Sequence, residues 1–220
     1  MAKKATNLLF MFYLIGGAPR SGKTILAKKL SKELNIPWVS TDSLELIAMK
    51  YTSEKDFDSI FPKSVIRKKT EKSNDRMYAE FSIDQIVESY IQQGKGLWPG
   101  ITSFIESEHG YGHDYILEGF HIFPELVSEL QKSFSITSVF LGKENFEKTL
   151  NGIKDNPQIN DWTVSHTKDP KTYELIAEMV NSFSLEFKKE AEKYSLNYMS
   201  TDDNFEDKIN KLSRGLMFPN

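Results

Sequence analysis

Short apolar runs separated by amphipathic stretches dominate the pattern of hydrophobic and polar positions along the chain. The first run, residues 8–15, is apolar throughout, which is typical of a strand covered on both faces of a parallel sheet. Shorter runs predict four further strands, over residues 38–40, 115–117, 136–141 and 196–199. Because helical patterns separate these runs, the chain is expected to alternate strand and helix around one parallel sheet.

A helix is predicted directly after the first strand and its loop. Leu26, Leu30 and Leu34 recur at helical spacing there. Asn35, followed by Pro37, is expected to end this helix, because a proline cannot continue it and disfavours a helical residue before it.

Two segments are longer than a simple crossover between strands requires: residues 44–110 and residues 143–170. In the first segment, apolar residues from Met77 onwards share one helical face, and we expect this helix to close at Gly94. A second helix is expected to start near Pro99, since proline is favoured in a first turn. Residues 1–220 are therefore predicted to form a single domain, with a core and two lobes over a cleft.

The strongest motif is Gly17-Ala-Pro-Arg-Ser-Gly22-Lys23-Thr24, which matches the phosphate-binding pattern G-x-x-x-x-G-K-[ST] between a strand and a helix. Its glycines allow backbone N–H groups to curl around phosphate oxygens, and the helix start adds free donors. Lys23 is expected to reach the β- and γ-phosphates and Thr24 to hold Mg²⁺. The alternative is an ordinary glycine-rich turn. The residues predicted here to bind ATP are Gly17, Ala18, Pro19, Arg20, Ser21, Gly22, Lys23 and Thr24.

The order of these features resembles the P-loop small-molecule kinases related to adenylate kinase. The resemblance rests on the phosphate loop after the first strand, an acid after the second, and Ile116-Leu-Glu-Gly-Phe120 after the third. Within that group, Gly16-Gly-Ala-Pro and Leu117-Glu-Gly-Phe-His-Ile-Phe-Pro124 are most similar to the 2-phosphoglycerate kinase-like branch. The resemblance implies an α/β P-loop NTPase fold with three αβα layers and a five-stranded parallel sheet. It also implies that residues 44–110 are a helical acceptor-binding insertion and residues 143–170 a lid.

Two acids at strand ends are candidate catalytic residues. Ligands of open parallel sheets bind beyond the carboxyl ends of the strands, where Asp42 and Glu118 lie. The resemblance implies that Asp42 orients the acceptor hydroxyl or accepts its proton. Alternatively, Thr41 or Asp42 caps a helix that begins at Ser43. Glu118 ends an apolar strand, and because a buried carboxylate without a partner is costly, we expect it to hold Mg²⁺ or bind the acceptor.

Phosphoryl transfer also needs cations around the migrating charge. Lids of the related kinases usually bring arginines, whereas residues 143–170 contain only lysines, which lack the bidentate fork of arginine. Arg67 and Arg76 are therefore the candidates for binding an anionic acceptor, the alternative being a solvated charged helix face. His121 is either an acceptor contact or a hydrogen-bonded structural residue. Asp202 lies in a turn that resembles the one over the adenine, or else caps the last helix.

Composition narrows the partners. The chain carries 28 Lys and Arg against 31 Asp and Glu, a formal charge of −3, which argues against nucleic-acid binding through bulk charge. It contains no cysteine, so disulfides, thiolate nucleophiles and cysteine-bound metals are excluded. The first apolar run imitates a secretory signal, but it is shorter than the roughly 20 residues that span a bilayer. We expect a cytoplasmic protein without a membrane partner.

Together these features predict a Mg²⁺- and ATP-dependent kinase that transfers the γ-phosphate to a small hydroxylated or anionic metabolite. One alternative is a nucleotide-dependent switch or ATPase that binds a partner, but the N-K-x-D guanine motif of one class of switch is absent. Another is a kinase for a sugar, an antibiotic or a polynucleotide end. The sequence leaves open the identity of the acceptor and the oligomeric state.

Overall fold

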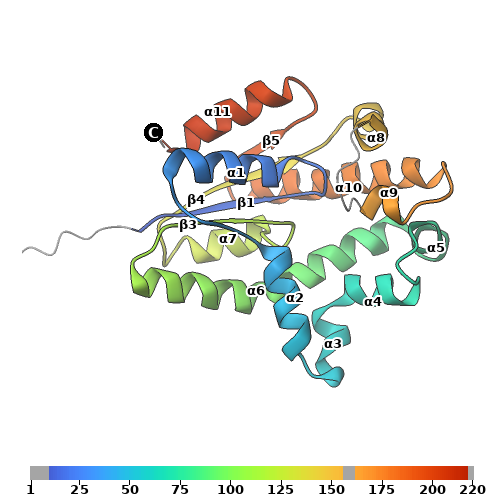
Figure 1. The fold of residues 1–220 in the computed structure, drawn as a ribbon, viewed down its shortest axis with the longest axis horizontal. Helices are drawn as coiled ribbons and strands as arrows, with labels where there is room; N and C mark the ends of the chain where they lie inside the picture. The colour runs from blue at the N-terminus through green and yellow to red at the C-terminus, as the bar shows by residue number, and fades with distance from the viewer. Residues whose placement is uncertain (1–9, 156–161, 218–220) are drawn as a thin grey trace, which may run out of the picture.

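A five-stranded parallel sheet forms the centre of the computed structural model, which describes residues 10–155 and 162–217 (Figure 1). The strands are β1 (Phe12–Gly17), β2 (Trp38–Ser40), β3 (Tyr115–Glu118), β4 (Ile136–Gly142) and β5 (Tyr198–Ser200). Their order across the sheet is β2-β3-β1-β4-β5. The predicted sheet is confirmed, with strand ends shifted by a few residues; positions 8 and 9 of the first predicted strand lie outside the described residues.

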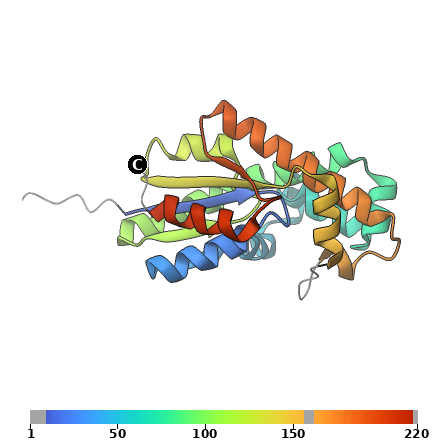
Figure 2. The same ribbon diagram turned by 90° about the horizontal axis from the view of Figure 1, so that it is seen from above.

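Helices cover both faces of the sheet. In chain order they are α1 (Lys23–Leu34), α2 (Thr41–Tyr51), α3 (Glu54–Ile60), α4 (Pro62–Lys69), α5 (Asn74–Glu80), α6 (Ile83–Tyr111), α7 (Pro124–Leu130), α8 (Phe146–Asp155), α9 (Trp162–Ser165), α10 (Thr172–Lys193) and α11 (Phe205–Met217). Helices α1 and α11 lie on one face and α6, α7 and α10 on the other (Figures 1 and 2). None of these helices combines the length and apolarity needed to cross a membrane.

Alternate residues of the strands feed the two cores. Ile15 of β1 is fully buried against Leu26 and Leu30 of α1, whereas Phe140 of β4 packs on the opposite face with Phe187 of α10. Burying each such side chain contributes about 1.5–3 kcal/mol. The predicted three-layer αβα fold around a five-stranded parallel sheet is confirmed by this arrangement.

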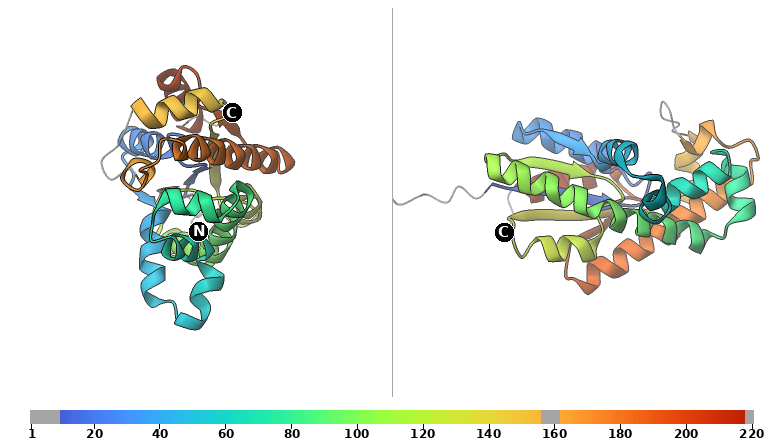
Figure 3. Two further views of the ribbon diagram at one scale, coloured as in Figure 1. Left: turned by 90° about the vertical axis from the view of Figure 1, so that its right-hand side faces the viewer. Right: turned by 90° about the horizontal axis from the view of Figure 1, so that it is seen from below.

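The register of the central strands aligns the ends of three strands. In β3, Glu118 lies opposite Ile15 of β1 on one side and opposite Ser40 of β2 on the other. The phosphate loop, the end of β3 and the start of α2 therefore leave the sheet at the same level. Beyond this edge, helices α2–α5 gather at one side of the core (Figures 1 and 3).

Helix α6 departs from the sequence prediction. It runs without a break over 29 residues, so the predicted end at Gly94 and the predicted second start near Pro99 are wrong. Ser82 caps its beginning through a capping box, and Gly112, with φ 79°, marks its end. Pro99 lies within the helix, which continues past it.

The glycines inside α6 serve close packing. A Cβ atom at Gly94 would lie 3.3 Å from the Cα of His121, and one at Gly96 would lie 2.5 Å from the carbonyl oxygen of Ile60. Both positions bring the helix against the backbone of another segment. A third glycine of the same helix, Gly100, has no atom within 4 Å of such a Cβ.

These glycines provide a matched pair of variants. We expect Gly96→Ala to destabilise the fold by about 1–3 kcal/mol, because the new methyl group overpacks against Ile60. Gly100→Ala should stabilise it by roughly 0.5–1 kcal/mol, since alanine is the better helix former and the position is open. Urea unfolding of both variants measures the difference; equal effects would contradict the packing role of Gly96.

Candidate active site

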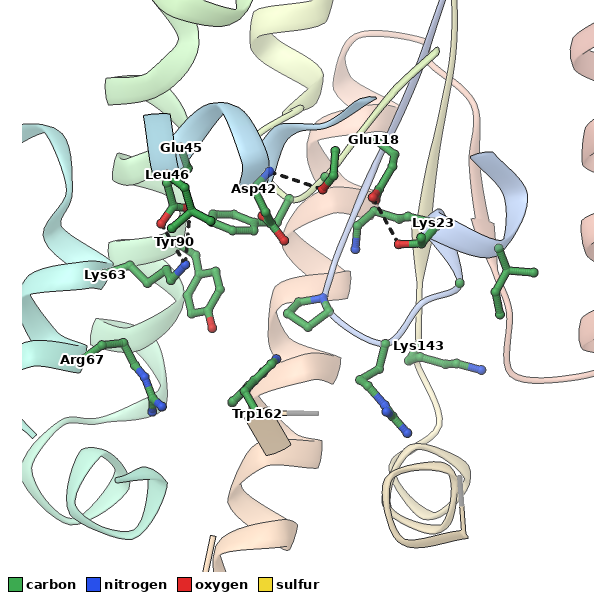
Figure 4. Close-up of a pocket in the computed structure, with 18 of the residues that line it drawn as sticks. Lys23, Asp42, Glu45, Leu46, Lys63, Arg67, Tyr90, Glu118, Lys143 and Trp162 are labelled. Carbon is green, nitrogen blue, oxygen red and sulfur yellow. Dashed lines mark hydrogen bonds and ion pairs between the residues drawn. The ribbon is translucent and has the colours of Figure 1, made fainter. Parts of the chain in front are cut away.

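A cleft of about 1900 Å³ opens at the edge of the sheet where β1, β2 and β3 end (Figure 4). The phosphate loop borders it on one side, and helices α2, α4 and α6 border it on the other. The cationic residues along it are Arg20, Lys23, Lys28, Lys63, Arg67, Lys68, Lys72, Lys143 and Lys148. The acidic ones are Asp42, Glu45, Glu71, Glu118 and Asp155. Charge within the cleft is therefore predominantly positive, in contrast to the whole chain.

The backbone of the phosphate loop requires glycine. Gly17 has φ 137° and Gly22 has φ 96°, conformations that other residues rarely adopt. A Cβ atom at Gly17 would lie 2.1 Å from the carbonyl oxygen of Leu141 in the neighbouring strand. The loop turns into α1 at Lys23, whose first-turn N–H groups have no partner within the helix and can bind an anion.

Lys23, Thr24 and Glu118 meet beside this loop. The Thr24 hydroxyl donates to Glu118 Oε1 at 3.1 Å, and Lys23 Nζ donates to the carbonyl oxygen of Ala18 at 2.7 Å. Figure 4 shows Lys23 and Glu118 close together at this edge of the cleft. Burial lowers the pKa of Lys23, against the opposing charges of Glu118 and Asp42. Burial likewise raises the pKa of Glu118, against the charge of Lys23. A hydroxyl and a carboxylate are the oxygen donors that Mg²⁺ takes, so these residues fit that ion.

Asp42 lies in the first turn of α2 and faces the cleft. The helix begins at Thr41, and its cap is Ser40, whose hydroxyl accepts a hydrogen bond from the Asp42 N–H at 3.3 Å. The alternative in which Thr41 or Asp42 caps a helix from Ser43 is therefore wrong. The Asp42 side chain is 66% exposed and is available to a ligand.

His121 lies behind Asp42 and has no exposed surface. Its Nδ1 is 2.8 Å from the Thr41 hydroxyl, and its Nε2 is 2.9 Å from Glu45 Oε2. Because an ionised carboxylate only accepts, Nε2 carries the proton and Nδ1 accepts from Thr41. Burial lowers the pKa of His121, which favours this neutral ring. In this position His121 forms the structural hydrogen bonds that the sequence left as one of two possibilities.

Glu45 joins three segments, and it is not among the site residues predicted above. Burial alone raises its pKa, but the hydrogen bond from His121 and the charge of Lys63 outweigh this and lower the pKa to about 2. Lys63 Nζ of α4 lies 3.4 Å from Glu45 Oε2, and His121 follows β3. No local pattern identifies Glu45, because its partners are distant in sequence.

Arg67 lines the cleft from α4, and its guanidinium has neutral partners. Its NH1 donates to Asn74 Oδ1 at 2.6 Å and its NH2 donates to the carbonyl oxygen of Lys72. The guanidinium also lies 6.0 Å from the ring centre of Trp162. Within the described ranges no carboxylate pairs with it, and burial lowers the pKa of Arg67. This half-buried charge is open to an anionic ligand.

Arg76, in contrast, lies outside the cleft. It forms exposed ion pairs with Glu71 at 2.6 Å and with Glu80 at 3.2 Å. The structure thus separates the two arginines that the sequence grouped together.

The segment 143–170, compared above to a lid, contacts both sides of the cleft. At one end, Arg20 NH2 of the phosphate loop donates to the carbonyl oxygen of Gly152 at 2.8 Å. At the other end, Asn74 Nδ2 donates to the carbonyl oxygen of Trp162 at 2.8 Å and to the Thr167 hydroxyl at 2.9 Å. Residues 156–161 of this segment lie outside the described ranges.

Asp202 orders a loop and does not line the cleft. Its Oδ2 accepts the backbone N–H groups of Glu144 at 2.7 Å and Asn145 at 3.2 Å. The neighbouring Lys143 does reach the cleft, with Nζ 5.6 Å from the ring centre of Phe205.

No protein-family model and no curated protein matches the chain. Among solved structures, a shikimate kinase from Bacteroides thetaiotaomicron is 13% identical at a TM-score of 0.48, covering 94% of this chain and 99% of that one. A gluconokinase from Sinorhizobium meliloti is 11% identical at a TM-score of 0.49, covering 93% and 90%. A shikimate kinase from Aquifex aeolicus is 20% identical at a TM-score of 0.45, covering 96% and 100%. These values describe a similar path of the backbone and no more. The resemblance to the 2-phosphoglycerate kinase-like branch stays a prediction.

Stability should depend on pH through Glu45. Its pKa of about 2 in the folded protein is below the 4.5 of an unperturbed glutamate, so its charge stabilises the fold above roughly pH 4.5. That contribution fades as the pH falls towards 2. His121 acts in the same sense, because its lowered pKa means that acid protonates the unfolded chain first.

We therefore expect Glu45→Gln to reduce the free energy of unfolding by about 3 kcal/mol at pH 7 and by about half as much or less at pH 3. Urea unfolding at both pH values measures this. Glu80→Gln, which removes an exposed ion pair, is the control and should change little at either pH. The same loss for Glu45→Gln at pH 3 and pH 7 would contradict the assigned charge.

Proposed function

We propose that the protein is a Mg²⁺- and ATP-dependent phosphotransferase that moves the γ-phosphoryl group to a small anionic or hydroxylated metabolite. One observation carries this proposal: the cleft that holds the phosphate loop continues past Asp42 into a space walled by α2, α4 and α6. That second space has room for an acceptor next to the nucleotide. A protein that only hydrolyses ATP has no need of it.

On the nucleotide side, the loop N–H groups and Lys23 bind the β- and γ-phosphates. Thr24 and Glu118 hold Mg²⁺, and the bound ion neutralises charge on the phosphates. Arg20 and Lys143 border the same half of the cleft and add positive charge. Lys23, Lys143 and Arg20 thus supply the positive charge that lid arginines supply in the related kinases, since residues 143–170 contain no arginine.

On the acceptor side, Asp42 orients the acceptor hydroxyl and takes its proton. The acceptor oxygen bonds to the γ-phosphorus while the bond from that phosphorus to the β–γ bridging oxygen breaks, and ADP leaves with the electron pair. Arg67 binds an anionic group of the acceptor, because its guanidinium has only neutral partners in the described structure and can form a bidentate pair. Closure of the cleft around both substrates excludes water and suppresses hydrolysis.

Two variants test the two halves of the cleft separately. We expect Lys23→Ala to abolish ATP binding, measured by titration with a fluorescent ATP analogue. Asp42→Asn should keep ATP binding but lower acceptor-dependent ADP release by about 10²–10⁴-fold, because the proton acceptor is lost. ADP release is followed over a panel of phosphorylated sugars, glycerate derivatives and nucleoside monophosphates. ADP release that no acceptor accelerates would favour an ATPase or switch.

The two arginines form a matched pair for the acceptor. Arg67→Gln should raise the acceptor KM by about 10–100-fold, the effect of losing a hydrogen bond to a charged group worth roughly 1.5–3 kcal/mol. Arg76→Gln should leave the KM unchanged, since Arg76 is engaged on the surface. Equal effects of the two substitutions would contradict the role of Arg67.

A further inference from the structure

Lys63 is a second cation of the acceptor half of the cleft, beside Arg67. Its Nζ lies 4.8 Å from the ring centre of Phe120 and 5.4 Å from that of Tyr90, and aromatic faces attract cations at such distances (Figure 4). Its side chain is 20% exposed and lines the cleft. Its carboxylate partner Glu45 is at 3.4 and 3.5 Å, longer than a good hydrogen bond. The ammonium therefore keeps donor capacity for a ligand.

Lys63 and Arg67 are neighbours on helix α4. They are four residues apart, a spacing that places side chains one above the other on the same helical face. Both line the cleft. One anionic group can thus contact both side chains. Of the two, Lys63 is also paired with Glu45 of α2.

Glu45 supplies a fixed negative charge that holds Lys63. Its side chain is only 8% exposed and accepts the Nε2–H of His121 at 2.9 Å. Since Glu45 belongs to α2 and Lys63 to α4, the pair sets the position of one wall of the acceptor space relative to the other.

His121 holds the first turn of α2. Thr41 fills the space beside Gly119, where a Cβ atom would lie 1.8 Å from the Thr41 hydroxyl oxygen. From there the hydroxyl donates to His121 Nδ1 at 2.8 Å. Asp42 follows directly, with its Oδ1 at 3.8 Å from the same ring nitrogen. Gly94 of α6 packs against the backbone of His121, where a Cβ atom would lie 3.3 Å from the His121 Cα.

We propose, on the basis of the phosphotransferase function above, that Lys63 contacts the anionic group of the acceptor together with Arg67, and that Glu45 and His121 are positioning residues. Glu45 holds Lys63, and His121 holds Glu45 and the helix turn that carries Asp42. The buried chain of hydrogen bonds thereby fixes the distance between the proton acceptor and the cation that binds the acceptor's charge. No proton passes through His121 in this arrangement.

The Lys63 contact is tested with sulfate as an anion probe. Calorimetric titrations are made on protein saturated with ADP and Mg²⁺, so that the phosphate loop is occupied. We expect Lys63→Met to weaken sulfate binding at least fivefold and Lys69→Met, which removes an exposed charge from the same helix, to leave it unchanged. Equal sulfate binding by Lys63→Met and the parent chain would overturn the contact.

The positioning role is tested by coupling between variants. Glu45→Gln and Lys63→Met should each raise the KM of whichever panel compound is phosphorylated, and the double variant should raise it no further. His121→Phe, which fills the space without hydrogen bonds, should lower kcat at least tenfold at unchanged ATP affinity. His121→Gln, which keeps a donor for Glu45, should recover part of that loss. Additive effects on KM, or a folded His121→Phe variant with unchanged kcat, would overturn the role.

One measurement uses the unaltered chain, so it requires neither a variant that folds nor a known acceptor. Nitrogen-15 spectra of the histidine rings should show His121 as the neutral Nε2–H form, and an Nδ1–H or doubly protonated ring would overturn the proposal. Failure of the proposed function is distinguishable, because it appears in the parent chain, either as absent binding of ADP and Mg²⁺ or as ADP release that no panel compound accelerates. In that event the sulfate titrations are repeated in the Lys23→Ala background, where the loop no longer competes.

Discussion

The alignment of three parallel strands is the constraint on which the site depends. Glu118 lies in register between Ile15 and Ser40, so the phosphate loop, the β3 carboxylate and the first turn of α2 leave the sheet side by side. A shift of β3 by one residue would turn Glu118 to the opposite face and away from Thr24. The core on both faces opposes such a shift, since every strand residue that moved would leave a packed position. The energy that fixes the site thus comes mainly from apolar side chains outside it.

Glu118 and Glu45 are both buried, but their surroundings shift the pKa of each carboxyl group in opposite directions. Around Glu118, burial prevails and raises the pKa, and its partners are Lys23 and a hydroxyl. Around Glu45, a ring N–H and the Lys63 ammonium prevail and lower the pKa. Glu45 is therefore held charged by His121 and Lys63 and serves structure, whereas Glu118 retains lone pairs for an ion.

The parts of the molecule that could be predicted from the sequence are those with a local signature. Contiguous apolar runs revealed the strands, and the spacing of glycine, lysine and threonine revealed the phosphate loop. Gly94 misled the prediction because a glycine inside a helix and a glycine after a helix look alike in sequence; only its neighbour His121 tells them apart. Glu45 and Asn74 were missed for a related reason, since their partners lie on other elements and leave no periodic trace.

Asn74 has a mechanical consequence. It is fully buried and bonds at once to Arg67 and to the backbone and hydroxyl groups of residues 162 and 167. Helix α5 and the far end of the segment 143–170 are therefore joined to the Arg67 guanidinium through one buried amide. The position of this guanidinium beside the cleft is thus set by residues from segments that are nearly a hundred positions apart in the chain.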